Sequence, residues 1–134
     1  MSFTIKEEWM SSTTINATTV GSTITLNLNA LGNASQEYVA KVIYHEVLHV
    51  YLGGSESGDH ATMAAKFVTP MAKALMAWFP LSLVDATGLT WSGLKDKGSA
   101  WNSVSPADKL SYTGIGDRYK NFNNGYNHAY GHSC

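Results

Sequence analysis

The sequence predicts an α+β fold in which a small N-terminal β-sheet packs on two successive helices. A polar-apolar alternation over about 23–29 is typical of a half-buried strand. Apolar residues recur at helical spacing over about 34–52 and again over about 59–79, which predicts two amphipathic helices. The remaining C-terminal part is expected to be helical or irregular. The length of 134 residues suits a single domain spanning 1–134.

The first 20 residues are rich in Thr, Ser and Asn and are predicted to hold one or two weak strands. The segment 23–29 is the best strand candidate, and its Ile24, Leu26 and Leu28 would face the core. We expect this strand to lie at an edge of the sheet, where an extended peptide could add as a further strand. A strand that only packs its apolar face on the helix fits the pattern equally well.

The first helix has capping signals at both ends. Asn33 or Ser35 can cap its start, with Gln36 as a capping-box partner three residues after Asn33. Gly53-Gly54 can end it. Four apolar residues recur on one face and would be buried there: Val39, Ile43, Val47 and Val50.

The middle of this helix carries the pentapeptide HEVLH, from His45 to His49. Residues four apart lie on the same face of a helix, so the rings of His45 and His49 can converge on one metal ion. Glu46 projects beside them and can take a proton from a water at that ion. This is the H-E-x-x-H pattern of zinc metallopeptidases. We expect one Zn²⁺ on His45 and His49, with Glu46 as the catalytic base.

A catalytic zinc site uses three protein ligands, so a third is needed. Asp59 is predicted to cap the second helix, which places His60 in its first turn and on its core-facing side. A buried imidazole needs a polar partner, and an ion held by the first helix would be one. His60 is therefore the candidate third ligand, and Asp59 is the runner-up. Glu56, in a turn rich in Gly and Ser, is expected to be solvated.

Pro70 falls inside the second helical pattern. Proline removes a backbone donor and clashes with the preceding turn, so we expect a kink or a break near 66–69. Apolar residues continue to Phe79, and Pro80 ends the helix.

Two further helices are predicted after Pro80. One starts at Ser82, runs to about Leu94, and packs Leu89 and Trp91 together with Leu94 on the first two helices. The other begins at the segment Ser105-Pro106-Ala107-Asp108, which supplies a cap, a proline at the first helical position and an early acid.

The segment 114–134 has no clear helical or strand period and is predicted to be an irregular tail, with the core over about 20–95. His128 and His132 are four residues apart, as metal-binding pairs on helices are. Glycines flank them and no apolar period supports a helix, so we expect no second metal site.

Composition narrows the possible partners and says little about location. The formal net charge is −1, which does not resemble the basic face of a nucleic-acid-binding protein. Cys134 is the only cysteine, so no disulfide within the chain is possible and the redox compartment stays open. We predict no signal peptide and no membrane-spanning segment, which fits a soluble protein or an excised domain of a secreted one.

The stretch HEVLHVYLGGSESGDHATMAAKF resembles the SprT-like zincin metallopeptidases, in particular their short bacterial domains of unknown function. The resemblance covers roughly residues 20–95. It implies a zincin fold, one zinc on His45, His49 and His60, and Glu46 as catalytic base. SprT-like enzymes that act on DNA-bound proteins carry added basic or zinc-ribbon segments. This chain has neither, so a protein or peptide substrate is expected and a nucleic-acid partner is not.

Three classes of function remain open at this stage. The first is a zinc endopeptidase, as a housekeeping protease or as the protease or toxin module of a larger protein. The second is a catalytically silent zincin-fold module that binds zinc or a partner. The third is a structural protein in which the histidines only hydrogen-bond with one another and hold no metal. Substrate specificity and oligomeric state do not follow from the sequence.

Overall fold

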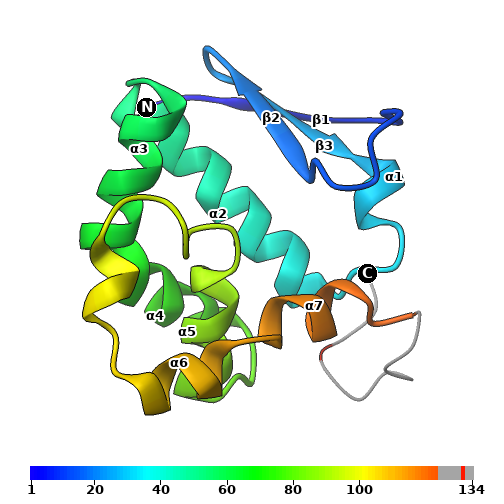
Figure 1. Cartoon of the computed structure of the whole chain (residues 1–134). Helices are drawn as coiled ribbons and strands as arrows, with labels where there is room; N and C mark the ends of the chain where they lie inside the picture. The colour runs from blue at the N-terminus through cyan, green and yellow to red at the C-terminus, as the bar shows by residue number, and fades with distance from the viewer. Residues whose placement is uncertain (124–130, 132–134) are drawn as a thin grey trace.

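The computed structural model describes residues 1–123 and 131. A small sheet lies over a group of helices (Figure 1). The strands are β1 (Thr4–Glu8), β2 (Ala17–Val20) and β3 (Thr23–Asn27). The helical segments are α1 (Leu28–Leu31), α2 (Gln36–Leu52), α3 (Glu56–Thr62), the π-helix η1 (Met63–Phe67), α4 (Val68–Trp78), α5 (Leu83–Trp91), the 3-10 helix η2 (Ala100–Ser103), α6 (Pro106–Tyr112) and α7 (Ile115–Lys120). The predicted α+β class is confirmed.

The strand order in the described sheet is β1-β3-β2. β1 pairs with β3 in parallel, and β2 pairs with β3 in antiparallel orientation across a turn at Gly21, whose φ is 59°. The expectation that the strand at 23–29 forms an edge is therefore wrong, because β3 has a neighbour on each side. The strand with a free side next to α2 is β2.

The third strand is also shorter than predicted. It ends at Asn27, whose side-chain oxygen accepts a hydrogen bond from the Asn29 backbone nitrogen at 3.0 Å and caps α1. Leu28 consequently begins a helical turn and is 42% exposed, so its predicted place in the core is wrong. Ile24 and Leu26 are buried, as expected.

Helix α2 lies between the sheet and the helices α4, α5 and α7 (Figure 1). Ser35 is its cap, since its hydroxyl accepts a hydrogen bond from the Tyr38 backbone nitrogen at 3.1 Å; Asn33 does not fill this position. Gly53 ends the helix in the left-handed region, with φ of 63°. The main core cluster joins α2 to residues of the sheet and of α4, α5 and α7: Ile24, Leu26, Leu31, Ala34, Tyr38, Val42, Ala72, Leu75, Ala86, Leu89, Ile115 and Tyr119.

The helix predicted over about 59–79 is present as three consecutive segments, α3, η1 and α4. It begins earlier than expected, because Ser55 caps α3 and Asp59 does not. The expected break near 66–69 is confirmed, since η1 ends at Phe67, whose φ of −113° departs from helical values. Pro70 has no N–H to offer the carbonyl four residues earlier, which explains a widened turn immediately before it.

The next two predicted helices are confirmed, with Ser82 capping α5 and Ser105 capping α6. α5 stops at Trp91, three residues before the predicted end. Trp91 and Leu94 are nevertheless buried, in a second cluster with residues of η1 and with Leu48 of α2. Among the described residues, no helix combines the length and the apolar character needed to cross a bilayer.

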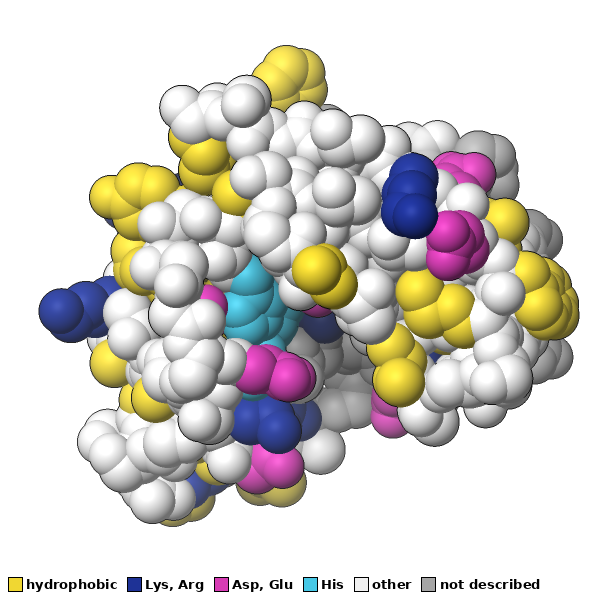
Figure 2. Space-filling view, turned by 90° about the horizontal axis from the view of Figure 1, so that it is seen from above, with side chains coloured by type: hydrophobic (Ala, Val, Ile, Leu, Met, Phe, Trp, Pro, Cys, Tyr) yellow, Lys and Arg dark blue, Asp and Glu magenta, His cyan; other side chains and the backbone are white. Residues whose placement is uncertain are grey.

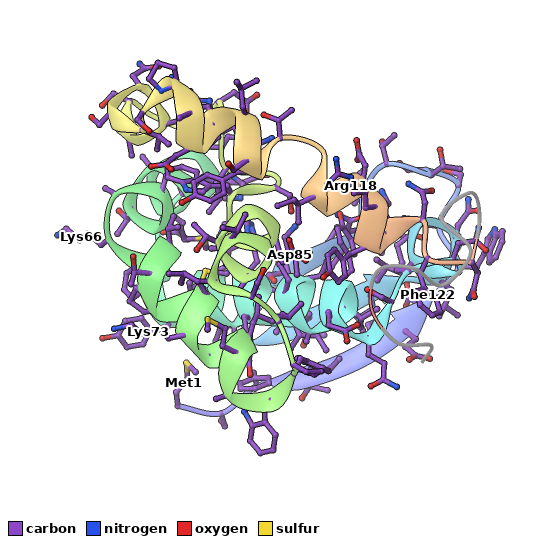
Figure 3. All side chains as sticks on the ribbon, turned by 90° about the horizontal axis from the view of Figure 1, so that it is seen from below. Met1, Lys66, Lys73, Asp85, Arg118 and Phe122 are labelled. Atoms are coloured by element: carbon purple, nitrogen blue, oxygen red, sulfur yellow. The ribbon has the colours of Figure 1, made fainter. Side chains whose placement is uncertain are left out.

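The prediction of an irregular tail from residue 114 is wrong for its first part. α7 packs on α5, where a Cβ added at Gly88 would lie 2.6 Å from Cδ1 of Ile115. The Tyr119 hydroxyl donates a hydrogen bond to Asp85 at 2.6 Å, and Phe122 is also buried (Figure 3). The core therefore extends well beyond residue 95. The histidines at 128 and 132 lie outside the described residues.

Candidate metal centre

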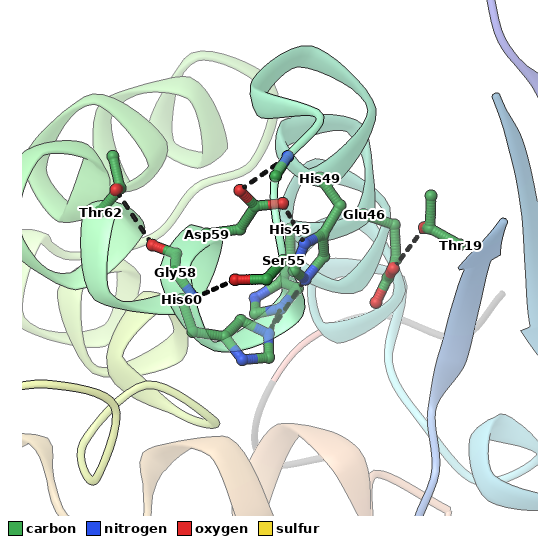
Figure 4. Close-up of polar contacts among 10 residues, drawn as sticks. Thr19, His45, Glu46, His49, Ser55, Gly58, Asp59, His60 and Thr62 are labelled. Atoms are coloured by element: carbon green, nitrogen blue, oxygen red, sulfur yellow. Dashed lines mark hydrogen bonds and ion pairs between the residues drawn. The ribbon is translucent and has the colours of Figure 1, made fainter. Parts of the chain in front are cut away.

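Three histidine rings meet between α2 and α3 (Figure 4). His45 and His49 lie one helical turn apart on α2, and His60 comes from the last turn of α3. Nε2 of His60 lies 2.9 Å from Nε2 of His45 and 2.9 Å from Nε2 of His49. Within the described part of the chain, these three residues are close enough to hold one metal ion. The structure brings all three predicted ligands together.

Hydrogen bonds between the three neutral imidazole rings cannot account for both of these short distances. The Nε2 atom of a neutral imidazole carries either one hydrogen or one lone pair in the plane of the ring. His60 Nε2 can therefore make only one good hydrogen bond, although both His45 Nε2 and His49 Nε2 lie at contact distance. A cation between the three rings would accept a lone pair from each of them. The donor set thus fits a metal ion better than it fits three histidines that satisfy one another.

The protonation of these rings also favours a cation ligand. The pKa of His45 is lowered to about 2, mainly by burial and in addition by the nearby charges of Lys41, His60 and His49. The pKa of His60 is also lowered, by burial first and then by His49. Both rings are consequently neutral near pH 7 and can offer a lone pair to a metal.

Asp59 contacts the His49 ring at Nδ1, the nitrogen opposite to the one that faces the other two histidines. Its Oδ2 atom lies 3.1 Å from Nδ1 of His49, and its Oδ1 atom accepts a hydrogen bond from the Gly54 backbone nitrogen at 3.2 Å. Asp59 is 5% exposed. It is thus neither the helix cap nor a member of the metal-ligand group that the sequence analysis considered. It fixes His49 in the orientation that directs Nε2 at the other rings.

Glu46 lies beside the histidines and is buried, with 9% exposure. The Thr19 hydroxyl of β2 donates a hydrogen bond to its Oε2 atom at 2.5 Å (Figure 4). This bond occupies one carboxylate oxygen and restricts the side chain. The carboxylate thereby joins the α2 site to the edge of the sheet.

A cleft with a volume of about 560 Å³ opens over these groups. Figure 2 shows the histidines at the bottom of a hollow, with acidic and basic side chains beside them. The cleft is lined by residues 15–19 before and along β2, by one face of α2, by His60 and Glu56 of α3, and by Ser92-Gly93 after α5. Glu56 is exposed, as predicted, and stands at its rim.

Lys41 is a further member of the cleft wall that the sequence analysis did not identify. It lies one turn before His45 on α2 and is only 4% exposed. Its pKa is lowered to about 8, mainly by burial and also by the Lys120 charge, while the Glu46 carboxylate acts in the opposite direction. The four-residue spacing from His45 was a usable signal, because it places Lys41 on the metal-binding face. Thr19 offered no such signal, since its contact depends on how the sheet packs.

Comparisons with protein-family models, with curated proteins and with solved structures gave no match. A function has to be inferred from the site itself, which combines three histidines, a carboxylate held by Thr19 and a cleft above them.

Proposed function

We propose that this protein is a zinc-dependent endopeptidase with a SprT-like, zincin-type active site. The observation that carries the proposal is the convergence of three imidazole nitrogens beside a restrained carboxylate at the bottom of a cleft. A site of three protein ligands leaves a fourth position open for substrate or water, as catalytic zinc sites do.

Zinc fits the donor set better than a hard cation does. Imidazole nitrogen is a preferred zinc ligand, whereas Mg²⁺ and Ca²⁺ prefer oxygen. Two nitrogens on one tetrahedral zinc, each at about 2.0–2.1 Å, would lie about 3.3 Å apart. The distances of 2.9 Å from His60 to His45 and to His49 are close to that value. A small outward shift of the rings is enough to admit the ion.

Glu46 would act as the general base and then as the general acid. Bound zinc supplies Lewis acidity, which lowers the pKa of a water and polarises a carbonyl. Glu46 takes the proton from the attacking water and passes it to the leaving amine. The Thr19 hydroxyl would hold one carboxylate oxygen and leave the other to take the proton. Asp59 keeps His49 in its ligand orientation.

Strand β2 would hold the substrate. It has one neighbour, β3, in the described sheet, and residues along it line the cleft. An extended peptide can add to such a strand through backbone hydrogen bonds. From the sequence, this role was expected for the strand at 23–29; we propose it for β2, because β3 is paired on both sides.

The experiment compares the wild type with Glu46→Gln on a denatured protein such as casein, both loaded with zinc. Hydrolysis by the wild type and its loss in the variant, with zinc content unchanged, are expected. The Asp108→Asn variant is a control, because Asp108 is an exposed acid on α6. Full activity in Glu46→Gln would contradict the assigned base. Zinc binding without turnover in the wild type would favour a catalytically silent zinc-binding module.

A further inference from the structure

Lys41 presents its ammonium group to the cleft at the end away from His49. Its side chain is almost fully buried, and a Cβ added at Gly93 would lie 3.9 Å from Nζ. The ammonium therefore faces the Ser92-Gly93 segment that borders the cleft. Lysine is rarely buried to this extent without an anionic partner, because the charge loses its hydration.

The surroundings of Lys41 supply no such partner among the described residues. Nζ lies 4.8 Å from the centre of the Tyr38 ring, a weak attraction compared with an ion pair. No hydrogen bond or ion pair to Nζ is formed within residues 1–123. The Lys120 charge disfavours the ammonium further, whereas the Glu46 carboxylate, which also accepts a hydrogen bond from Thr19, favours it. Within the described residues, Glu46 is thus the acidic group that acts on Lys41, and no carboxylate oxygen is bonded to Nζ.

A second polar group at the same end of the cleft is also incomplete. Asn16 donates its amide nitrogen to the Tyr38 hydroxyl at 2.9 Å, and its Oδ1 atom is buried without a hydrogen-bond partner. Asn16 and Lys41 both line the cleft and both contact Tyr38. Asn16 and Lys41 thus mark the same end of the cleft wall, next to Tyr38.

The direction of β2 indicates which part of a substrate would reach this end. Asn16, just before β2, contacts Tyr38 near the start of α2, whereas Thr19 contacts Glu46 beyond the middle of α2. A peptide added antiparallel to β2, the more stable pairing, would run from the Thr19 end to the Asn16 end. The residues that follow the bond held at the metal centre would then lie toward Lys41.

We propose that Lys41 binds a carboxylate of the substrate, on the leaving-group side of the cleaved bond. The carboxylate is either the free C-terminus of a short peptide or the side chain of an Asp or Glu. This inference rests on the proposed peptidase function, which it deepens by naming the substrate class.

The test measures binding without turnover, by calorimetric titration of the zinc-loaded Glu46→Gln protein. One probe pair is acetyl-trialanine as the free acid and as the C-terminal amide. The other pair is acetyl-Ala-Asp-Ala-amide and acetyl-Ala-Asn-Ala-amide. A charge-assisted hydrogen bond is worth about 1.5–3 kcal/mol, so we expect the acid of at least one pair to bind about tenfold or more tightly than its neutral partner. The pair that shows the preference identifies the source of the carboxylate.

Variants made in the same Glu46→Gln protein show which residue causes the preference for the acid peptide over its neutral partner. Lys41→Met should abolish the preference, and Lys41→Arg should keep most of it. Lys73→Met is the matched control, because Lys73 is exposed on α4, away from the cleft (Figure 3). A preference that survives in Lys41→Met would mean that the metal itself holds the carboxylate, and it would overturn the proposal. Equal binding of acid and neutral peptides, or no binding of either acid, would overturn it as well.

The binding test of Lys41 and the hydrolysis test of the proposed peptidase function can fail independently of each other. Binding is measured in a protein that lacks the Glu46 carboxylate, so a failure of the wild type to hydrolyse peptides does not change the result. Conversely, hydrolysis by the wild type with no preference for carboxylates would leave the peptidase proposal intact and refute the role of Lys41.

Discussion

The Asp59 carboxylate and the His49 ring meet at 3.1 Å, through the ring nitrogen that faces away from the other two histidines. A carboxylate on the second nitrogen fixes the ring orientation and makes the first a better metal ligand. Gly54 helps to hold the carboxylate through its backbone nitrogen. Helix α3 thus carries both the residue that orients a ligand of α2, Asp59, and a further ligand candidate, His60.

Removal of the Asp59 carboxylate should weaken metal binding without abolishing it. We expect Asp59→Ala to lower zinc affinity by about 10- to 100-fold, because His49 loses the group that orients it. Competition with a chromogenic chelator measures the affinity. Asp108→Ala, which removes an exposed acid from α6, should leave it unchanged. An affinity equal to that of the wild type would show that His49 needs no such support.

Loss of the Thr19 hydroxyl should affect turnover more than binding. Thr19→Val removes the hydrogen bond to Glu46 while it keeps the shape of the side chain. We expect kcat to fall about tenfold, with KM and zinc content little changed, since a hydrogen bond to a charged group is worth about 1.5–3 kcal/mol. Thr19→Ser restores the hydroxyl and should recover most of the rate. A Thr19→Val enzyme with normal kcat would remove Thr19 from the mechanism.

The charge of Lys41 should cost stability near neutral pH. Its pKa is about 8 in the folded chain and 10.5 as a free side chain, so the unfolded chain holds the proton more tightly. The charged lysine therefore opposes folding fully below pH 8, and the penalty shrinks as the pH rises toward 10.5. Lys41→Met should raise the free energy of unfolding near neutral pH, by up to about 3 kcal/mol.

Urea unfolding of both metal-free proteins across this pH range measures the effect. The difference between the variant and the wild type should decline from pH 8 to pH 10.5. A variant that is less stable than the wild type near neutral pH would show that the lysine is compensated in the folded protein. A stability gain together with a loss of carboxylate binding would identify Lys41 as a functional residue that the fold tolerates.

The packing of α7 on α5 can be tested by two substitutions that should compensate each other. Gly88→Ala would place a methyl group 2.6 Å from the Ile115 side chain and should destabilise the protein by about 1–3 kcal/mol. Ile115→Ala removes a side chain that is 2% exposed and should cost about 2–5 kcal/mol. The double variant should be more stable than the sum of the single effects predicts, because the added methyl enters the space left by Ile115. Strict additivity in chemical unfolding would contradict the contact.

Local patterns predicted the parts of the site that depend on one helix. The four-residue spacing of His45 and His49 is a property of α2 alone, and Ser35 and Gly53 mark its ends by their own capping contacts. The prediction of His60 as the third ligand needed only the assumption that a short turn returns the chain to the same side. The start of α3, the helix that carries His60, was predicted less well, because Ser55 caps it one turn before Asp59.

Contacts between segments that are distant in the sequence could not be predicted from such local patterns. The alternation over 23–29 does not reveal how many neighbours the strand has, and it hides the point at which Asn27 turns the chain into α1. α7 was missed because Gly114 and Gly116 interrupt its apolar pattern. Both glycines have structural reasons: Gly114 has a φ of 84°, and a Cβ on Gly116 would lie 2.5 Å from Cβ of Ser92. Such reasons are visible only once the elements are packed.

The most direct test of the account is the metal content of the purified protein, measured by elemental mass spectrometry for the wild type and for His60→Ala. The account predicts about one zinc per chain in the wild type and a sharp loss in His60→Ala. His128→Ala, outside the HEVLH helix, should keep its zinc. A folded wild-type chain that contains no zinc, and takes up none when zinc is added, would contradict the three-histidine metal site.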